Sequence, residues 1–471
     1  MSDAHSNPWR LSRRRFLELT GAGAAMLYVG CGDDDDDEGG RAGAEETSFV
    51  EPRSQLSGDL RILMWSHFVP SHDEWFDPFA RDWGRRVGVN VTVDHIDTAG
   101  VVARISSEIS ARRGHDLIQH IAPLSQFEPS VVDMTDVTEE AVSRYGEQLD
   151  VCRRSSFNPT TEKFYAYSPS WVPDPGNYRK SLWEGVGLGD GPSTWDQLLE
   201  GGAEIKNTEG TQLGIGMSQE IDSNMAARAL LWSFGASIQD ENENVVINSD
   251  ETVEAVAFMK RLFEQAMTDE VFAWNAASNN QGLISGELSY ILNSISGFRT
   301  AQETNPDVAN DTLFVPALEG PRDQLVASHV MYNWIVPEHA RNVDAAKEFL
   351  LHYTENFAQA TDNSKLYDLP AFSERVPQLE EWLDNDPYGG QPPNLLAVLK
   401  DATDWSTNIG HPGPMNTAEG EVFATFVIPN MLASAARGDA SPQEAVAAAE
   451  REIRPIFEKW KRRGLVGGGG A

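Results

Sequence analysis

Short apolar segments alternate with longer helical patterns between residues 58 and 118, and few folds accommodate that alternation. Three segments have the composition of buried strands, namely Leu60–Trp65, Val89–Val93 and Asp116–Ile118. Between the first two, a capping box at Ser71 and Glu74 precedes Trp75, Phe79 and Trp83 at four-residue spacing, which predicts a helix with one apolar face. A second helix is predicted over Val101–Arg112. Strand, helix, strand, helix, strand is typical of an α/β fold whose parallel sheet is covered on both faces.

The same pattern continues toward the C-terminus. Thr194 with Gln197 predicts a helix start, and Asn248 is the predicted cap of a helix through Met267. A strand is expected over Ser328–Pro337 and a helix over Val343–Tyr353. Ser441, followed by Pro442 and Glu444, has the cap, first-turn proline and acidic residue of a final helix.

The N-terminus resembles an export signal. The block Ser12-Arg13-Arg14-Arg15-Phe16-Leu17 precedes an apolar stretch, 17–30, that is shorter than the about 20 residues needed to span a bilayer. This order is similar to the twin-arginine signal, so residues 1–30 are the predicted signal peptide. Cys31 stands where lipoproteins are lipidated, although Tyr28 replaces the usual Leu, and the acidic segment 31–53 is expected to be a flexible leash.

The charge of the chain excludes several partners. Its 37 Lys and Arg face 72 Asp and Glu, which gives a formal net charge of −35. Such a field repels DNA and anionic membranes, so we expect no nucleic-acid partner and no membrane contact except through a lipid anchor. An acidic surface also confers solubility, and it does not by itself identify a function.

Six motifs, in family order, resemble the family 1 extracellular solute-binding proteins of ABC importers, the maltose-binding-protein-like group. They lie at 58–65 (GDLRILMW), 114–118 (GHDLI), 191–198 (GPSTWDQL), 234–249 (FGAS to VINS), 285–294 (SGE to NS) and 344–350 (DAAKEFL). The resemblance covers about residues 58–460. It implies an α/β fold of two lobes, the type II periplasmic-binding-protein-like fold, with the ligand cleft between the lobes and hinge closure around the solute. By element order, the N-lobe would hold 54–165 and 317–356, and the C-lobe 166–316 and 357–471.

Candidate ligand-binding residues follow from strand ends and from the family order. Aromatic faces and polar side chains recognise sugars, and ligands of open α/β lobes sit at the carboxyl ends of strands. The strand ends, the family positions and a 411–414 loop expected at the mouth of the cleft give nine candidates: Trp65, His67, Phe68, His120, Asp222, Asn224, Trp274, Asn293 and His411. The maltose-binding pattern has an aromatic residue near Asp222 where this chain has Asn224, which argues against maltodextrin itself. Each candidate is equally compatible with a place in the core or in an exposed loop.

Catalytic and metal motifs are absent from the sequence. His67, His72, Asp73 and His95 could suggest metal ligands, but no HExxH or tight Cys/His spacing occurs, so we predict neither metal nor cofactor. No G-x-S-x-G elbow, P-loop or dinucleotide fingerprint is present.

The expected function is therefore that of an exported, monomeric, non-enzymatic receptor, periplasmic or on the outer face of the cytoplasmic membrane. The resemblance implies that it binds a small polar solute, with a sugar or polyol expected, and delivers it to the transmembrane subunits of an ABC permease. Alternatives are a non-sugar solute (polyamine, peptide or sugar phosphate), an exported carbohydrate-active hydrolase, or a purely structural lipoprotein.

Overall fold

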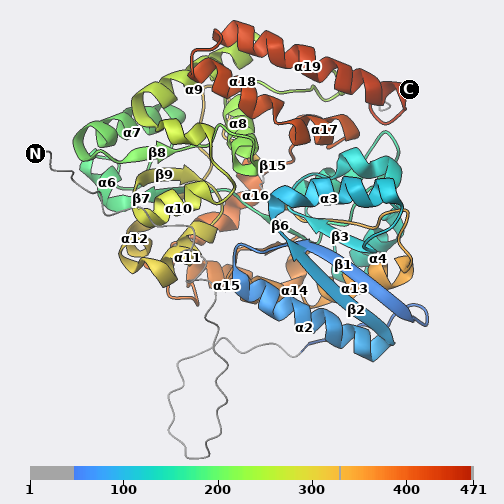
Figure 1. The fold of residues 1–471 in the computed structure, drawn as a ribbon. Coiled ribbons are helices and arrows are strands. Elements are labelled where there is room, and N and C mark those ends of the chain that lie inside the picture. Colours follow the sequence, from blue (N-terminus) through green and yellow to red (C-terminus); the bar gives the residue numbers. More distant parts are fainter. Residues whose placement is uncertain (1–46, 328–329, 468–471) are drawn as a thin grey trace, which may run out of the picture. The chain divides into compact units, whose positions relative to one another are not determined.

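Two four-stranded sheets organise the part of the chain that the computed structural model describes, residues 47–327 and 330–467 (Figure 1). These residues belong to one unit, Glu45–Ala471. The predicted signal peptide, Cys31 and the leash up to residue 46 lie outside the described residues.

The first sheet has the strand order β13-β3-β1-β2. Strands β1 (Gly58–Trp65), β2 (Val89–Ile96) and β3 (Leu117–His120) are parallel, and β13 (Asn333–Ile335) is antiparallel to β3. Helix α2 (Pro70–Val87) connects β1 to β2, and α3 (Thr98–Ala111) connects β2 to β3. Because β2 and β3 flank β1 on opposite sides, right-handed connections bring the two helices to opposite faces of the sheet (Figure 1). The predicted alternation is confirmed.

Helix α2 begins differently from the prediction. Its N-cap is Val69, whose side chain cannot cap, and Pro70 occupies the first turn. The hydroxyl of Ser71 instead donates to the carbonyl of Asn363, at 2.6 Å. The predicted capping box at Ser71 is therefore wrong, because proline is itself well suited to the first helical position and places Ser71 inside the helix.

The second sheet has the order β10-β7-β9-β8. Its strands are β7 (Gly176–Arg179), β8 (Gln212–Gly214), β9 (Leu288–Leu292) and β10 (Thr312–Val315), of which only β8 and β9 pair in parallel among the described pairs of this sheet. Helices α7 (Trp195–Glu209) and α10 (Ser278–Ser285) contact β8 and β9. The hydroxyl of Thr194 accepts the Gln197 amide N–H at 3.1 Å, which confirms the predicted start of α7.

A third, three-stranded sheet pairs segments that are distant in sequence. Strand β6 (Ser170–Val172) lies between β12 (Val330–Met331) and β14 (Leu369–Pro370), antiparallel to both. Each of these strands follows one of the predicted lobe boundaries, at 165/166, 316/317 and 356/357. The single strand predicted over Ser328–Pro337 is divided, because the chain pairs with β6 before Tyr332 and with β3 after it.

Helices of the C-terminal half pack mainly on one another. Helix α18 (Val427–Ala436) contacts α8 (Ile221–Ser233), α9 (Asp250–Ala266) and α19 (Pro442–Arg462). The capping box at Ser441 and Glu444 is confirmed in full. Helix α9 is capped by Ser249 rather than Asn248, whose amide donates to Glu450 at 2.7 Å.

The remaining elements complete the described fold. The α-helices among them are α4 (Thr135–Tyr145), α5 (Asp150–Ser156), α6 (Lys180–Gly185), α11 (Ser296–Thr304), α12 (Pro306–Asp311), α13 (Val343–Glu355), α14 (Phe357–Asn363), α15 (Leu379–Asp384), α16 (Ala402–Trp405) and α17 (Thr417–Thr425). The short strands are β4 (Phe157–Asn158), β5 (Lys163–Phe164), β11 (Val326–Ala327) and β15 (Ser406–Thr407). The 3-10 helices are η1 (Ser125–Ser130), η2 (Asp269–Phe272), η3 (Ser373–Arg375) and η4 (Ala397–Asp401).

The chain contacts this fold earlier than the predicted leash boundary at residue 53. The backbone of Ser48 exchanges two hydrogen bonds with the amide of Asn356, at 2.7 and 2.9 Å. Arg53 pairs with Glu348 at 2.5 Å. Residues 47–53 thus pack on α13 and its C-terminal end. The acidic composition of the segment 31–53 gave no indication of these contacts.

Candidate functional site

Aromatic side chains gather at the carboxyl end of β1. Trp65 is buried, and its ring centroid lies 4.9 Å from that of His67, 5.0 Å from Phe68 and 6.2 Å from Tyr332. Tyr367 meets His67 edge-on at 5.1 Å. We call Trp65, His67, Phe68, Tyr332 and Tyr367 the aromatic cluster; three of its five members were predicted.

Carboxylate and amide side chains gather beside the second sheet. The Asp222 carboxylate accepts hydrogen bonds from the amides of Asn279, at 2.8 Å, and Asn293, at 3.3 Å. The Asn293 amide also donates to Asn280, at 3.0 Å. We call Asp222, Asn279, Asn280 and Asn293 the amide cluster, and all four side chains are buried.

Local structure holds the amide cluster in place. Asp222 stands in the first turn of α8, where the Glu220 side chain caps the helix by accepting the N–H groups of Asp222, at 2.6 Å, and Ser223, at 2.5 Å. Burial and the neighbouring charge of Asp222 raise the pKa of Glu220 to about 8. Asn293 follows β9, and Asn279 and Asn280 lie in the first turn of α10. The Asp222 carboxylate therefore comes from α8, and the amides come from α10 and from the end of β9.

Tyr367, a member of the aromatic cluster, is also influenced by charges outside it. Burial raises the pKa of its phenol well above the usual value, an effect that Ser294 opposes and the charges of Asp368, Asp174 and Asp222 reinforce. The charge of Asp222 thus links the phenol electrostatically to the amide cluster. Of the predicted residues, Trp65, His67 and Phe68 thus belong to the aromatic cluster, and Asp222 and Asn293 belong to the amide cluster.

Three predicted residues lie in other surroundings. The Asn224 side chain donates to the carbonyl of Phe423 at 3.1 Å and accepts from Arg228 at 2.9 Å, so it joins α8 to α17. His411 packs edge-on against Trp232 and contacts Thr407 at 3.2 Å. Trp274 is half-buried and lines a separate cavity of about 780 Å³ between β8 and α10.

His120, the ninth candidate, is buried at the carboxyl end of β3, the strand that pairs in parallel with β1, and lies opposite Asn333 of β13. Burial lowers the pKa of its imidazole to about 3, so the ring is neutral at physiological pH. Its Nδ1 atom finds no hydrogen-bond partner within residues 47–327 and 330–467. This orphaned nitrogen is compatible with a contact to a solute, and the assignment of His120 stays a prediction.

Sequence reasoning missed Asp368, which contacts the aromatic cluster, and the remaining members of both clusters. Tyr332, Tyr367 and Asp368 are about 265 to 301 positions from His67 and belong to no motif. Asn279 and Asn280 follow Trp274-Asn275 closely, and the paired asparagines were the one signal that could have found them.

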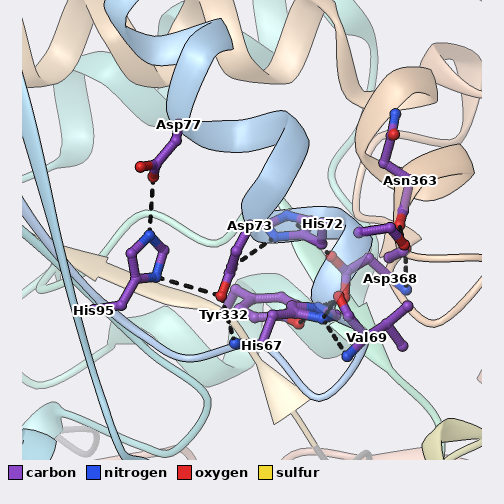
Figure 2. Close-up of polar contacts among 11 residues, drawn as sticks. His67, Val69, His72, Asp73, Asp77, His95, Tyr332, Asn363 and Asp368 are labelled. Atoms are coloured by element: carbon purple, nitrogen blue, oxygen red, sulfur yellow. Dashed lines mark hydrogen bonds and ion pairs between the residues drawn. The ribbon is translucent and has the colours of Figure 1, made fainter. Parts of the chain in front are cut away.

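A group of possible metal ligands adjoins the aromatic cluster (Figure 2). His67, His72 and Asp368 are buried, and one ligand atom of each lies within 4.8 Å of the others. The sequence predicted no metal, because the two histidines and the aspartate have no recognised spacing.

Solved structures that resemble this chain include solute-binding proteins. The maltose-bound MalE3 of T. maritima has a TM-score of 0.70 and 18% sequence identity, over 85% of this chain and 100% of that one. A sugar transporter of Arthrobacter chlorophenolicus A6 with bound laminaribiose has a TM-score of 0.72 and 16% sequence identity, over 85% of this chain and 99% of that one. A solute-binding protein of Agrobacterium radiobacter K84 in complex with ribitol has a TM-score of 0.68 and 16% sequence identity, over 86% of this chain and 100% of that one. These likenesses confirm the predicted two-lobe fold.

Sequence comparisons agree with the fold. A binding protein of Brucella abortus (strain 2308) is 23% identical over 175 residues, 37% of this chain and 42% of that protein, so less than half of the relative's length is matched. In the described part of the chain, none of the helices is both long and apolar enough to cross a membrane. The family model of the bacterial extracellular solute-binding proteins matches residues 74–388, and the chain belongs to this family.

Proposed function

We propose that this protein captures a sugar or polyol and delivers it to the transmembrane subunits of an ABC permease, without chemical turnover. The observation that carries the proposal is the presence of both an aromatic cluster at the end of β1 and a buried cluster of one carboxylate and three amides beside the second sheet. Relatives of the same fold that bind maltose, laminaribiose and ribitol support this class of solute.

The two clusters offer complementary chemistry for such a solute. Aromatic faces pack on the apolar face of a sugar ring, and Trp65 and Tyr332 are stacked at an interplanar angle of 20°. Amides donate to and accept from hydroxyl groups, while the Asp222 carboxylate accepts only. The contacts that now join Asp222, Asn279 and Asn293 are of the kind that a polyhydroxylated solute can replace one for one.

Calorimetric titration of the full chain with mono- and oligosaccharides, polyols, amines and amino acids tests the proposal. We expect binding among the sugars or polyols. Loss of one hydrogen-bonding amide in Asn293→Ala should weaken binding about fivefold, since a hydrogen bond contributes about 1 kcal/mol. Asn305→Ala is the matched control, because that half-buried amide donates only to the Ile284 carbonyl and should leave affinity unchanged.

Other outcomes would revise the proposal. Binding only of amines, peptides or sugar phosphates would keep the receptor and replace the solute class. Release of the chromophore from aryl glycosides would indicate a hydrolase instead of a receptor. No binding by a folded chain, together with no co-purified solute, would contradict the receptor itself.

We further propose export through the twin-arginine signal at Arg13-Arg14 and anchoring through lipidated Cys31, with the protein acting as a monomer at the outer face of the cytoplasmic membrane. Substitution of both arginines by lysine should retain the protein in the cytoplasm. Cys31→Ser should release it from the membrane fraction without changing solute affinity. An unchanged membrane fraction for Cys31→Ser would remove the lipid anchor from the proposal.

A further inference from the structure

Three potential metal ligands converge from distant segments. His67 follows β1, His72 lies in the first turn of α2, and Asp368 directly precedes β14 (Figure 2). The side chain of each is only 1% exposed. The fold therefore gathers two imidazoles and one carboxylate where water has little access.

The separation between His72 and Asp368 suits a shared cation better than a direct hydrogen bond, whereas His67 Nε2 is within hydrogen-bond distance of Asp368 and, at 3.1 Å, of the Tyr332 hydroxyl. The Nε2 atom of His67 lies 3.3 Å from one Asp368 oxygen, and the Nε2 atom of His72 lies 3.6 Å from the other. The second separation is too long for a hydrogen bond. Around a tetrahedral Zn²⁺ with bonds of about 2.0–2.1 Å, neighbouring ligand atoms stand roughly 3.4 Å apart.

Two of these buried atoms lack another partner. His72 Nε2 and Asp368 Oδ2 make no hydrogen bond to any residue that the structure describes. A buried polar atom without a partner costs about 1–3 kcal/mol. A cation between the two would satisfy both atoms at once.

The opposite ring nitrogens are already oriented. His67 Nδ1 lies 3.0 Å from the carbonyl oxygen of Val69, and His72 Nδ1 lies 3.4 Å from Asp73. Metal-binding histidines typically donate their second ring N–H to a carbonyl or carboxylate in this way. The Val69 N–H lies 2.9 Å from the same His67 nitrogen, so the metal-free ring has access to both tautomers, and metal binding would select the one protonated at Nδ1.

Further groups hold the potential ligands. Tyr332 donates to Asp368 Oδ1 at 2.6 Å, and Asp73 accepts the backbone N–H of His67 at 2.9 Å. Asp73 also lies 3.4 Å from His95, whose other nitrogen contacts Asp77 at 2.9 Å (Figure 2). Asp73 thus contacts both His67 and His72, and His95 in turn restrains the Asp73 carboxylate.

We propose that His67, His72 and Asp368 bind a divalent transition metal ion, with Zn²⁺ as the ion that their nitrogen and oxygen donors suit. Two imidazoles disfavour Mg²⁺ and Ca²⁺, which prefer oxygen ligands. Because Tyr332 touches both Asp368 and the Trp65 ring, the bound ion would stiffen one wall of the aromatic cluster. The proposal does not depend on the solute, since metal and sugar binding are measured separately.

Equilibrium dialysis of the full, untagged, metal-stripped chain against ZnCl₂ tests the site, with MgCl₂ and CaCl₂ in parallel. We expect one Zn²⁺ per chain, and no Mg²⁺ or Ca²⁺ at the same concentration. Asp73→Asn should weaken Zn²⁺ binding about 10–100-fold, the usual effect of losing a group that orients a ligand. His72→Gln should abolish stoichiometric binding.

His352→Gln is the matched control, because His352 is equally buried but has aromatic and amide neighbours instead of a carboxylate pair. It should bind Zn²⁺ like the parent chain. Co²⁺ absorption of the parent chain adds a test that needs no variant, since a tetrahedral nitrogen and oxygen site gives a visible band. Absence of that band, only weak binding of several ions per chain, or unchanged binding by a folded His72→Gln would each overturn the proposal.

Discussion

The imidazole of His352 shows how one buried residue couples stability to pH. Its ring stacks on Phe79 at 5.0 Å and 7°, and Phe49 meets it edge-on at 6.0 Å. Burial, together with the positive charge of Arg86, lowers the pKa of His352 from 6.5 to about 4. The folded protein therefore holds this ring neutral over a range in which the unfolded chain protonates it.

This depressed pKa predicts a loss of stability in acid. Between pH 6.5 and pH 5 the unfolded state binds the proton and the folded state does not, so His352 should lower the free energy of unfolding by about 2 kcal/mol. His352→Phe keeps the stacked ring and removes the titration. Urea unfolding at both pH values should show a smaller acid-induced loss in the variant, and equal losses would contradict the assignment.

At the scale of elements, Gly84 lets helix α2 approach strand β2. A Cβ atom at this position would lie 2.5 Å from the Val89 carbonyl oxygen and 2.5 Å from a methyl group of Val91. Gly84→Ala should cost about 1–3 kcal/mol, as overpacking of an interior does. Gly185→Ala is the control in another helix, because a Cβ atom there would have nothing within 4 Å, and it should cause no loss. Thermal unfolding of the two variants measures the difference.

The N-terminus of α19 gives a second prediction at this scale. Ser441 accepts the Glu444 N–H at 3.3 Å, and the Glu444 carboxylate accepts the Ser441 N–H at 2.9 Å. Ser441→Ala should lower the free energy of unfolding by about 1 kcal/mol. Ser110→Ala, which removes an exposed hydroxyl that donates to the Ser106 carbonyl within α3, should leave stability unchanged or slightly higher. Equal destabilisation by both variants would argue against the cap.

Across the molecule, residues 47–53 tie the start of the folded unit to α13 and α14. Ser48 bonds twice to Asn356, Phe49 packs on His352, and Arg53 pairs with Glu348. A chain beginning at Leu56 should thus be about 2 kcal/mol less stable than one beginning at Glu45, chiefly through the two lost backbone hydrogen bonds. Parallel urea unfolding of the two chains checks this. Identical midpoints would show that the docking contributes nothing in solution.

Local patterns predicted many elements because they depend on neighbouring residues. Strands β1 to β3, the caps of α7 and α19 and the helix α13 all follow from periodicity or short-range hydrogen bonding. The start of α2 was mispredicted where Pro70 and a Ser71 contact to Asn363 overrode a local motif. The candidate site was only half predictable, since Trp65, His67 and Phe68 mark a strand end while Tyr367 carries no local signal.

The sequence alone determined the α/β class, the order of elements and the family, because periodicity, capping and motif order are written in neighbouring residues. Only the tertiary structure decided which side chains meet. It brought Tyr332, Tyr367 and Asp368 to His67, and it separated Asn224 from Asp222 although they lie two positions apart in α8. A helix turns about 100° per residue and distant strands pair through the backbone, so sequence proximity does not predict which side chains share a site.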